Sequence, residues 1–295
     1  MRDAYIVSSV RTPGCRRTKG AFKDTRPEDL LTFIMRTAVE KAHPIEPGHI
    51  DDVMIGCSFP EAEQGLNIGS VNREAEDGAH YEILLRMRDE NGGLFSPALF
   101  IEAAERYDKT PEIDRWVIRN TFRWLVSEAD ERERLALCSI NLSGKSLGDE
   151  KFLPFVVNQF QMSGLDATKI CFEITETAAI ASYSQANRFI NALKELGCKF
   201  ALDDFGTGLS SFGYLKHFPV DFLKIDGSFV KEILHDPIDR EMVRSIAQIG
   251  RLTGKKTIAE FAENEEIITM LRGMDIDYAQ GYGVSEPKRV TRAVA

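Results

Sequence analysis

The chain has 295 residues, 43% of them hydrophobic, and a formal net charge of −9. This length suffices for one large domain or two ordinary ones, and the hydrophobic fraction suffices for a buried core. The negative charge argues against a nucleic-acid duplex as partner, because duplex binding depends on lysine and arginine contacts to phosphates. An anionic ligand stays compatible with the sequence if metal ions lie between it and the protein.

The five cysteines are widely spaced, and no Cys-x-x-Cys pair occurs. This usage favours a reducing compartment and argues against a disulfide framework or a zinc knuckle. The first apolar stretch is too short for a signal peptide, and no run approaches the roughly 18–20 apolar residues that span a bilayer. We therefore expect a soluble, cytoplasmic protein without a membrane segment.

The first quarter of the chain predicts one β–α–β unit. Residues 4–10 and 50–58 have the composition of strands, and residues 26–42 carry apolar side chains at helical spacing. Such a unit is too small to be stable alone. Residues 59–79 show little periodicity and are interpreted as a linker.

From residue 80 onward, strand-like runs alternate with helical patterns, which predicts a parallel sheet. The predicted strands are residues 80–87, 135–143, 169–177, 199–206, 220–227, 255–263 and 276–284. Amphipathic stretches such as 110–129 and 182–197 lie between them, and the second ends on Gly197, as helices often do. Seven repeats predict a β/α barrel with one strand unaccounted for.

Each predicted strand is apolar for most of its length and acquires a polar side chain, in most cases near its carboxyl end. These side chains are Glu82, Asn141, Glu173 with Glu176, Asp203 with Asp204, Lys224 with Asp226, Glu260 with Glu263, and Gln280. In a parallel barrel the carboxyl ends meet on one face, where the loops build the active site. Oxygen ligands without histidine or cysteine favour hard cations such as Mg²⁺, Mn²⁺ or Ca²⁺.

The adjacent acids Asp203 and Asp204 suit a pair of metal ions, because one carboxylate can bridge both. Two ions roughly 3.5–4 Å apart clamp a phosphodiester for attack by water. Lys224 is the one cation of the set, and it would either position the water or neutralise a developing oxyanion. The pattern therefore favours phosphodiester hydrolysis.

These segments resemble the EAL domain, the cyclic-di-GMP phosphodiesterase family, over residues 80–288. The matching motifs, in the family's order, are Glu82-Ile83-Leu84 with Ile in place of the usual Ala, "SINLS", "FEITE", "DDFGTG", "LKID", "AEFAE" and "QGYGVSEP". The resemblance implies a TIM-like (β/α)8 barrel. It also implies that the protein opens cyclic di-GMP to linear pGpG with two bound Mg²⁺ or Mn²⁺ ions.

The resemblance also implies a role for each matching residue. The first metal would be held by Glu82, Asn141, Glu173 and Asp203, and the second by Asp203, Asp204 and Glu260. Lys224 and Glu260 would act on the attacking water. Glu176 would hold the loop after Asp204 or act directly. The substrate side of the site would be formed by Arg86, which would contact a phosphate, with Gln280 and Glu263.

Residues 1–70 resemble the amino terminus of a thiolase, the acetyl-CoA acyltransferase family, in "MRDAYIVSSVRTP" and "IDDVMIGCSFPEAEQGLNIG". The Asn-x-x-Cys nucleophile context and the later His and Cys motifs of that family are absent. Cys57 is therefore interpreted as a small buried residue, and thiolase acyl transfer is not expected. We expect two domains, an incomplete thiolase-like fragment at 1–71 and an EAL phosphodiesterase domain at 72–295.

The first strand of the EAL family, about twenty residues before its naming Glu, is not recognisable in the sequence. The predicted barrel therefore lacks one strand and exposes two edges, unless residues 4–10 or 52–57 supply it. Two alternatives follow from this gap: a catalytically impaired module that only binds cyclic di-GMP, and a non-functional fusion. Because the family often pairs through the region after its Asp-Asp loop, a homodimer is a further expectation.

Overall fold

A computed structural model describes residues 65–72, 79–88, 94–95, 97–207 and 214–290, and Thr37 alone before them. The chain divides into two compact units, one of residues 1–61 with 90–93 and the other of residues 62–89 with 94–295. The β–α–β unit predicted before residue 59 lies outside the described residues, apart from Thr37. All that follows concerns the second unit.

The second unit alternates strands and helices, as the sequence predicts. The strands are β1 (Gly65–Asn72), β2 (Ala79–Arg88), β3 (Leu94–Phe95), β4 (Leu135–Leu142), β5 (Ile170–Thr175), β6 (Lys199–Phe205), β7 (Phe222–Ile225), β8 (Lys256–Ala259), β9 (Tyr278–Gln280) and β10 (Lys288–Arg289). The helices are α2 (Pro97–Arg106), α3 (Thr110–Ser127), α4 (Ala129–Arg134), α5 (Gly144–Gly148), α6 (Phe152–Ser163), the 3₁₀ helix η2 (Ala167–Lys169), α7 (Glu176–Ala181), α8 (Tyr183–Glu195), α9 (Gly227–Lys231), α10 (Pro237–Thr253) and α11 (Glu265–Arg272).

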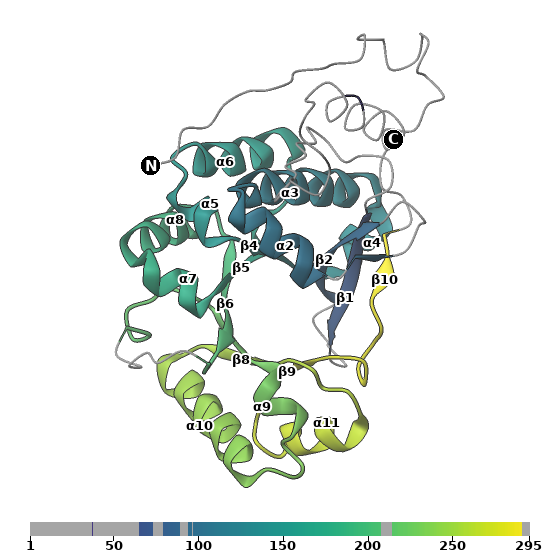
Figure 1. The fold of residues 1–295 in the computed structure, drawn as a ribbon, viewed down its shortest axis with the longest axis vertical. Coiled ribbons are helices and arrows are strands. Elements are labelled where there is room, and N and C mark those ends of the chain that lie inside the picture. The colour runs from purple at the N-terminus through teal and green to yellow at the C-terminus, as the bar shows by residue number, and fades with distance from the viewer. Residues whose placement is uncertain are drawn as a thin grey trace. The chain divides into compact units, whose positions relative to one another are not determined.

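Eight of the described strands form a closed ring. Neighbours pair in the order β1, β9, β8, β7, β6, β5, β4, β2, and β2 pairs again with β1. The pairs from β2 through β9 are parallel, whereas β1 runs antiparallel to both of its neighbours. Figure 1 shows the strands around a central axis with α6, α8 and α10 outside them. The predicted α/β barrel is confirmed.

The expectation of a missing strand is wrong, because β1 lies within the segment interpreted as a linker. Its sequence, "GLNIGSVN", contains two glycines and alternates only weakly, so local propensity gives a poor strand signal. Six residue pairs with β2 and two with β9 supply the stabilisation instead. Since β1 is antiparallel, it needs no crossover helix to enter the sheet.

The core is arranged in two layers on either side of the ring. The outer faces of the strands and the helices form one large apolar cluster, which includes Phe172, Phe200 and Leu223. A second, smaller cluster is formed by side chains of the intervening strand positions, Leu137, Cys171, Ala201, Phe222 and Ile258, packed with Tyr278. Strand alternation explains the two sets, because successive side chains point to opposite faces. The second set is the filled interior expected of a small barrel.

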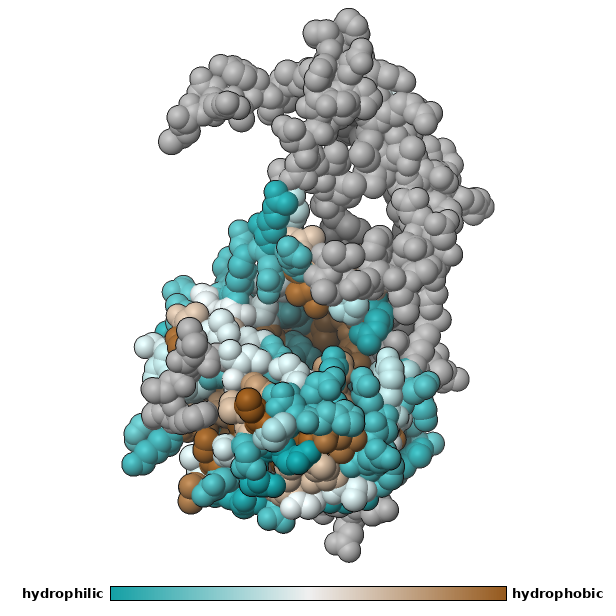
Figure 2. All heavy atoms as spheres, turned by 60° about the horizontal axis from the view of Figure 1, so that its bottom comes forward, coloured by the Kyte–Doolittle hydropathy of each residue, from teal (hydrophilic) through white to brown (hydrophobic). Residues whose placement is uncertain are grey.

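The described surface mixes hydrophilic and hydrophobic side chains. On the face in Figure 2, hydrophobic side chains lie between hydrophilic ones. Met162, Ile238 and Leu252 are the most exposed large apolar residues among the described ones. None of the described helices is long and apolar enough to cross a membrane.

Candidate metal-binding active site

The predicted site residues lie directly above the small interior cluster. Glu173, Asp203 and Lys224 each follow a member of that cluster by two residues in β5, β6 and β7. A spacing of two keeps a side chain on the same strand face, so the polar groups enter the barrel at the carboxyl ends of the strands. The apolar layer forms the floor, and the polar layer forms the site.

Lys224 lies at the centre of this polar layer and is fully buried. Its Nζ is 2.6 Å from Glu173 Oε2, 2.8 Å from Glu260 Oε1, 3.1 Å from Asp203 Oδ1 and 3.6 Å from Glu82 Oε2. Burial lowers the pKa of an ammonium group, but the surrounding carboxylates outweigh it and raise the pKa of Lys224 well above its usual value. Lys224 is therefore a permanent cation that holds together three acids from strands and Glu260, which directly follows β8.

Glu82 is held by two carboxamides in addition to Lys224. Asn141 Nδ2 donates to Glu82 Oε1 at 2.6 Å, and Gln280 Nε2 donates to Glu82 Oε2. Burial would raise the pKa of Glu82, but Lys224, Gln280 and Asn141 together lower it. β1 lies between β2, which carries Glu82, and β9, which carries Gln280, with Gly69 opposite Glu82 and Val71 opposite Gln280. The strand that the sequence did not reveal thus joins β2 to β9 beside this site.

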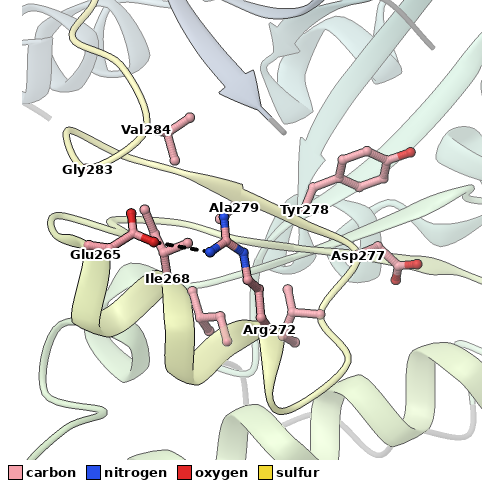
Figure 3. Close-up of a pocket in the computed structure, with 10 residues that line it drawn as sticks. Glu265, Ile268, Arg272, Asp277, Tyr278, Ala279, Gly283 and Val284 are labelled. Carbon is pink, nitrogen blue, oxygen red and sulfur yellow. Dashed lines mark hydrogen bonds and ion pairs between the residues drawn. The ribbon is translucent and has the colours of Figure 1, made fainter. Parts of the chain in front are cut away.

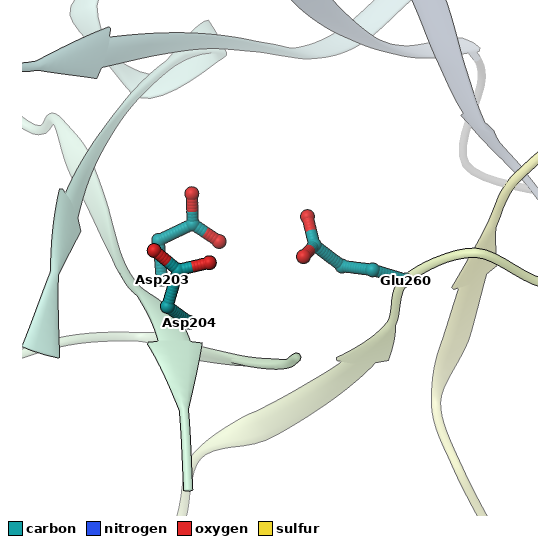
Figure 4. Close-up of side chains that lie close together, drawn as sticks. All are labelled: Asp203, Asp204 and Glu260. Atoms are coloured by element: carbon teal, nitrogen blue, oxygen red, sulfur yellow. The ribbon is translucent and has the colours of Figure 1, made fainter. Parts of the chain in front are cut away.

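Asp203, Asp204 and Glu260 form a second group at the same end of the barrel. One carboxylate oxygen from each lies within 4.8 Å of the others, and Figure 4 shows the three side chains facing one another. Asp204 adopts a positive φ of 53°, which turns its side chain at the end of β6. Carboxylates at this spacing repel one another unless they take up protons or a cation.

Burial, and after it the neighbouring carboxylates, raise the pKa values of three of these acids. The pKa of Glu173 is raised to about 8, by burial first and then by Glu82 and Asp203, although Lys224 opposes the rise. The pKa of Glu260 is raised to about 7, again mainly by burial. Burial and the Asp203 charge raise that of Asp204 to about 6. The cluster thus carries more acid than its single ammonium group can neutralise.

Some of the buried oxygens in the cluster have no donor. Glu173 Oε1 and Gln280 Oε1 accept no hydrogen bond from any described residue, and Asp203 Oδ1 has the Lys224 ammonium group at 3.1 Å. Unsatisfied buried acceptors are costly and rare in folded proteins. An excess of carboxylates with free oxygens, without histidine or cysteine, fits a hard divalent cation such as Mg²⁺ or Mn²⁺.

Glu176 takes a position beside the cluster rather than in it. Its Oε2 accepts from Gly206 N at 3.1 Å, and its Oε1 accepts from Tyr214 Oη at 2.7 Å. These residues flank the segment that follows Asp204. Glu176 thus bonds residues on both sides of that segment and makes no contact with Lys224.

Arg86 and Glu263 do not join the cluster. Arg86 lies four residues after Glu82 on β2, hence on the same strand face, and its Nη1 donates to Leu85 O at 2.9 Å. Glu263 is exposed in the loop after β8. Asp226, another strand-end acid, caps α9 by accepting from Ser228 N at 2.8 Å.

A separate cavity of about 150 Å³ lies between α11, β9 and the loop that follows β9. Figure 3 shows its lining, which includes Ile268, Arg272 and Val284, with Arg272 paired to Glu265. None of the predicted site residues lines it. This cavity is therefore distinct from the acidic cluster.

Sequence reasoning missed two residues that support the site. Tyr214 binds Glu176, and Asp114 accepts three hydrogen bonds beside the end of β4. The sequence predicts an amphipathic stretch at residues 110–129, and Asp114 lies three and four residues before the buried Val117 and Ile118. An acid on the buried face of an amphipathic helix was the available signal.

Known proteins resemble the chain in the part that carries this cluster. Residues 71–287 match the family described as EAL domain, and residues 4–79 match the one described as Thiolase, N-terminal domain.

Two curated relatives are named cyclic di-GMP phosphodiesterases. PdeB of Shewanella oneidensis is 44% identical over 207 residues, and PdeF of Escherichia coli is 37% identical over 211 residues. These alignments cover 70% and 71% of this chain but only 24% and 28% of the relatives, so the chain spans about a quarter of their length.

Two solved structures share the fold. The FimX EAL domain from Pseudomonas aeruginosa bound to c-di-GMP has a TM-score of 0.70 at 30% identity, and it covers 77% of this chain and 91% of its own. The PaMucR phosphodiesterase in its c-di-GMP complex has a TM-score of 0.71 at 28% identity, covering 77% of this chain and 92% of its own. The family match spans most of the chain and includes the whole acidic cluster; the chain belongs to the EAL domain family.

Proposed function

We propose that the EAL part of this chain hydrolyses cyclic di-GMP to linear pGpG with Mg²⁺ or Mn²⁺. The sequence assigns this part to residues 72–295, and β1 adds Gly65–Asn72 to it. The names of the relatives support the substrate, since PdeB and PdeF are cyclic di-GMP phosphodiesterases and both solved structures contain c-di-GMP. The observation that carries the proposal is the buried acidic cluster around Lys224.

The cluster offers oxygen ligands for two cations. Glu82, Asn141, Glu173 and Asp203 would hold one, and Asp203, Asp204 and Glu260 would hold the other. Such ions supply Lewis acidity and neutralise charge on the phosphate in its transition state. Support for this assignment comes from the unpartnered Oε1 of Glu173 and from the short spacing of the second group.

The chain's own residues would bind the substrate and accept the proton of the attacking water. Arg86 provides a cation on the same strand face as Glu82, where it would bind a substrate phosphate. Lys224, at the centre of the polar layer, would stabilise negative charge that develops in the site. Glu260, beside Lys224 Nζ at 2.8 Å, would accept the proton of an attacking water on its carboxylate.

The alternative of a binding module without catalysis depended on an incomplete barrel. β1 pairs with both β2 and β9 and so occupies the position that was expected to be open. The ligand types expected of an active site are also present together in one cluster. Both observations favour the enzyme over the binding module and over the non-functional fusion.

The test is a hydrolysis assay on the purified full chain with cyclic di-GMP and Mn²⁺ or Mg²⁺. We expect linear pGpG to accumulate only when the divalent ion is present, and we expect Glu82→Ala to abolish turnover. Calorimetry run in parallel separates the alternatives. Tight cyclic di-GMP binding by folded, metal-loaded protein without any product would refute the enzyme and select the binding module.

For residues 1–71 we infer an incomplete thiolase amino-terminal domain without acyl-transfer activity. The match of residues 4–79 to that domain supports the origin of the segment. The absent Asn-x-x-Cys context argues against the activity. Release of free CoA from acetyl-CoA in a thiol-reagent assay would contradict this inference.

A further inference from the structure

A buried carboxylate lies behind the acidic cluster, on the helix side of the barrel. Asp114 of α3 is 7% exposed, and its Oδ2 accepts from Ser143 N at 2.8 Å, Ser143 Oγ at 2.7 Å and Ser146 Oγ at 2.6 Å. Three donors on one oxygen fix its position. Burying a carboxylate is costly, and these three hydrogen bonds compensate that cost, so the residues that donate them are held firmly in place.

This point is the exit of β4. Ser143 follows β4 directly and caps α5, and it is two residues after Asn141. Asn141 is itself exposed, so packing does not orient it, and its Nδ2 donates to Glu82 Oε1 at 2.6 Å. The direction of the Asn141 side chain therefore depends on the backbone that Asp114 holds.

The other side of the same segment is also fixed. A Cβ added at Gly144 would lie 2.9 Å from Ala178 Cβ, so α5 packs closely against α7. The first residue of α7 is Glu176, which binds Gly206 N. The exit of β4 is thus confined between Asp114 on one side and α7 on the other, and loss of the Asp114 bonds would leave it attached on one side.

We propose that Asp114 is a positioning residue that holds Asn141 against Glu82 and thereby sets the affinity of the acidic cluster for a divalent cation. The inference rests on the proposed function only in that the cluster binds such a cation. Groups that orient metal ligands from behind commonly contribute about 10–100-fold to metal affinity.

The experiment measures Mn²⁺ binding to the metal-free full chain by calorimetry, without substrate. We expect Asp114→Ala to raise the Mn²⁺ Kd about tenfold or more and Asp114→Asn to raise it less, because Asn keeps an acceptor oxygen of the same shape. If Asp114→Ala does not fold, Ser146→Ala removes a single donor, and we expect it to raise the Kd a few-fold.

Asp277→Ala is the matched control. Asp277 Oδ2 accepts from Thr257 N at 2.8 Å and Thr257 Oγ1 at 3.0 Å, a network of the same kind at the opposite end of the strands. We expect this variant to lose thermal stability but to keep the parent's Kd. A combined Asp114→Ala and Asn141→Ala variant should bind no more weakly than Asn141→Ala alone, because Asp114 acts through Asn141.

The outcomes separate the two levels of inference. If all three variants bind Mn²⁺ with the parent's Kd, the positioning role is overturned and the proposed function stands. These variants are Asp114→Ala, Asp114→Asn and Ser146→Ala. Additive effects in the combined variant would overturn the route through Asn141. A folded parent chain that binds no Mn²⁺ would overturn both the positioning role and the metal-dependent function.

Discussion

Carboxylates occur at both ends of the barrel, but their surroundings differ. At the amino-terminal end, Asp221 accepts from Phe200 N at 3.0 Å and Lys194 Nζ at 2.8 Å. At the carboxyl-terminal end, Glu173 and Asp203 crowd around one lysine, and Glu173 Oε1 accepts no hydrogen bond from any described residue. An acid with its own donors stabilises the fold, whereas acids forced together at the expense of hydrogen bonding indicate function.

The largest expected effect is the loss of activity when Glu173, at the carboxyl-terminal end, is replaced by a neutral residue. We expect Glu173→Gln to reduce cyclic di-GMP hydrolysis about 10³-fold or more, since a proposed metal ligand is lost. Stability of the metal-free protein should change little, because a pKa raised to about 8 already favours the uncharged acid at neutral pH. Hydrolysis assays and thermal unfolding in EDTA measure the two effects, and activity within tenfold of the parent would contradict the assignment.

The opposite result is expected at the amino-terminal end. Asp277→Ala leaves the Thr257 N–H and hydroxyl without their acceptor, which should cost about 1–3 kcal/mol of unfolding free energy. Turnover per folded molecule should stay within about twofold of the parent, since the change is remote from the site. Urea unfolding and active-site-normalised kinetics check this, and a selective loss of kcat would show that the two ends are not separable.

How far the sequence predicts this division depends on the feature. The acids were predicted because they lie near the carboxyl ends of apolar strands, which meet on one face of a parallel barrel, as with Asp203 in β6. β1 was not, because its stability comes from pairing with distant strands rather than from its own residues. Asp114 was not, because no local pattern reveals which donors a buried acid will meet.

Titration of the metal-free protein should sharpen the comparison further. Glu173 and Glu260 have folded-state pKa values of about 8 and about 7, both above the ordinary value of 4.5, mainly through burial. Their contribution to stability is complete below pH 4.5 and is lost as the pH rises through 7 to 8. In EDTA, the free energy of unfolding should therefore fall between pH 5.5 and 8.5, on the order of 5 kcal/mol for the two acids together.

Thermal unfolding at the two pH values, with and without Mn²⁺, measures this effect. Mn²⁺ should remove most of the dependence, because the cation compensates the charge that the protons leave behind. Glu173→Gln should weaken the dependence in EDTA, and Asp277→Ala should leave it unchanged. Stability in EDTA that does not vary over this range would show that the acids are already compensated.

Positive φ values occur at both ends of the barrel, including 59° at Asp275 just before β9. At the amino-terminal end, α6 and α10 finish on Gly164 and Gly254 with φ of 65° and 68°, positions that suit glycine. At the site, two residues that are not glycine, Asp204 and Phe261, adopt φ of 53° and 52°. A bulky residue in this region is strained, and such strain is found mostly at functional sites.

The smallest expected effect tests that strain at Phe261, directly after Glu260. Its ring packs on Gly227, where a Cβ would lie 2.0 Å from Phe261 Cδ2, and Lys231 Nζ lies 3.9 Å from the ring centre. Phe261→Ala loses these contacts and keeps the strain, whereas Phe261→Gly loses both. We therefore expect the Gly variant to be more stable than the Ala variant by about 1 kcal/mol in urea unfolding. The control is Gln248 on the exposed face of α10, where the Ala variant should be more stable than the Gly variant by a similar amount. If the Ala variant were the more stable one at both positions, Phe261 would carry no strain.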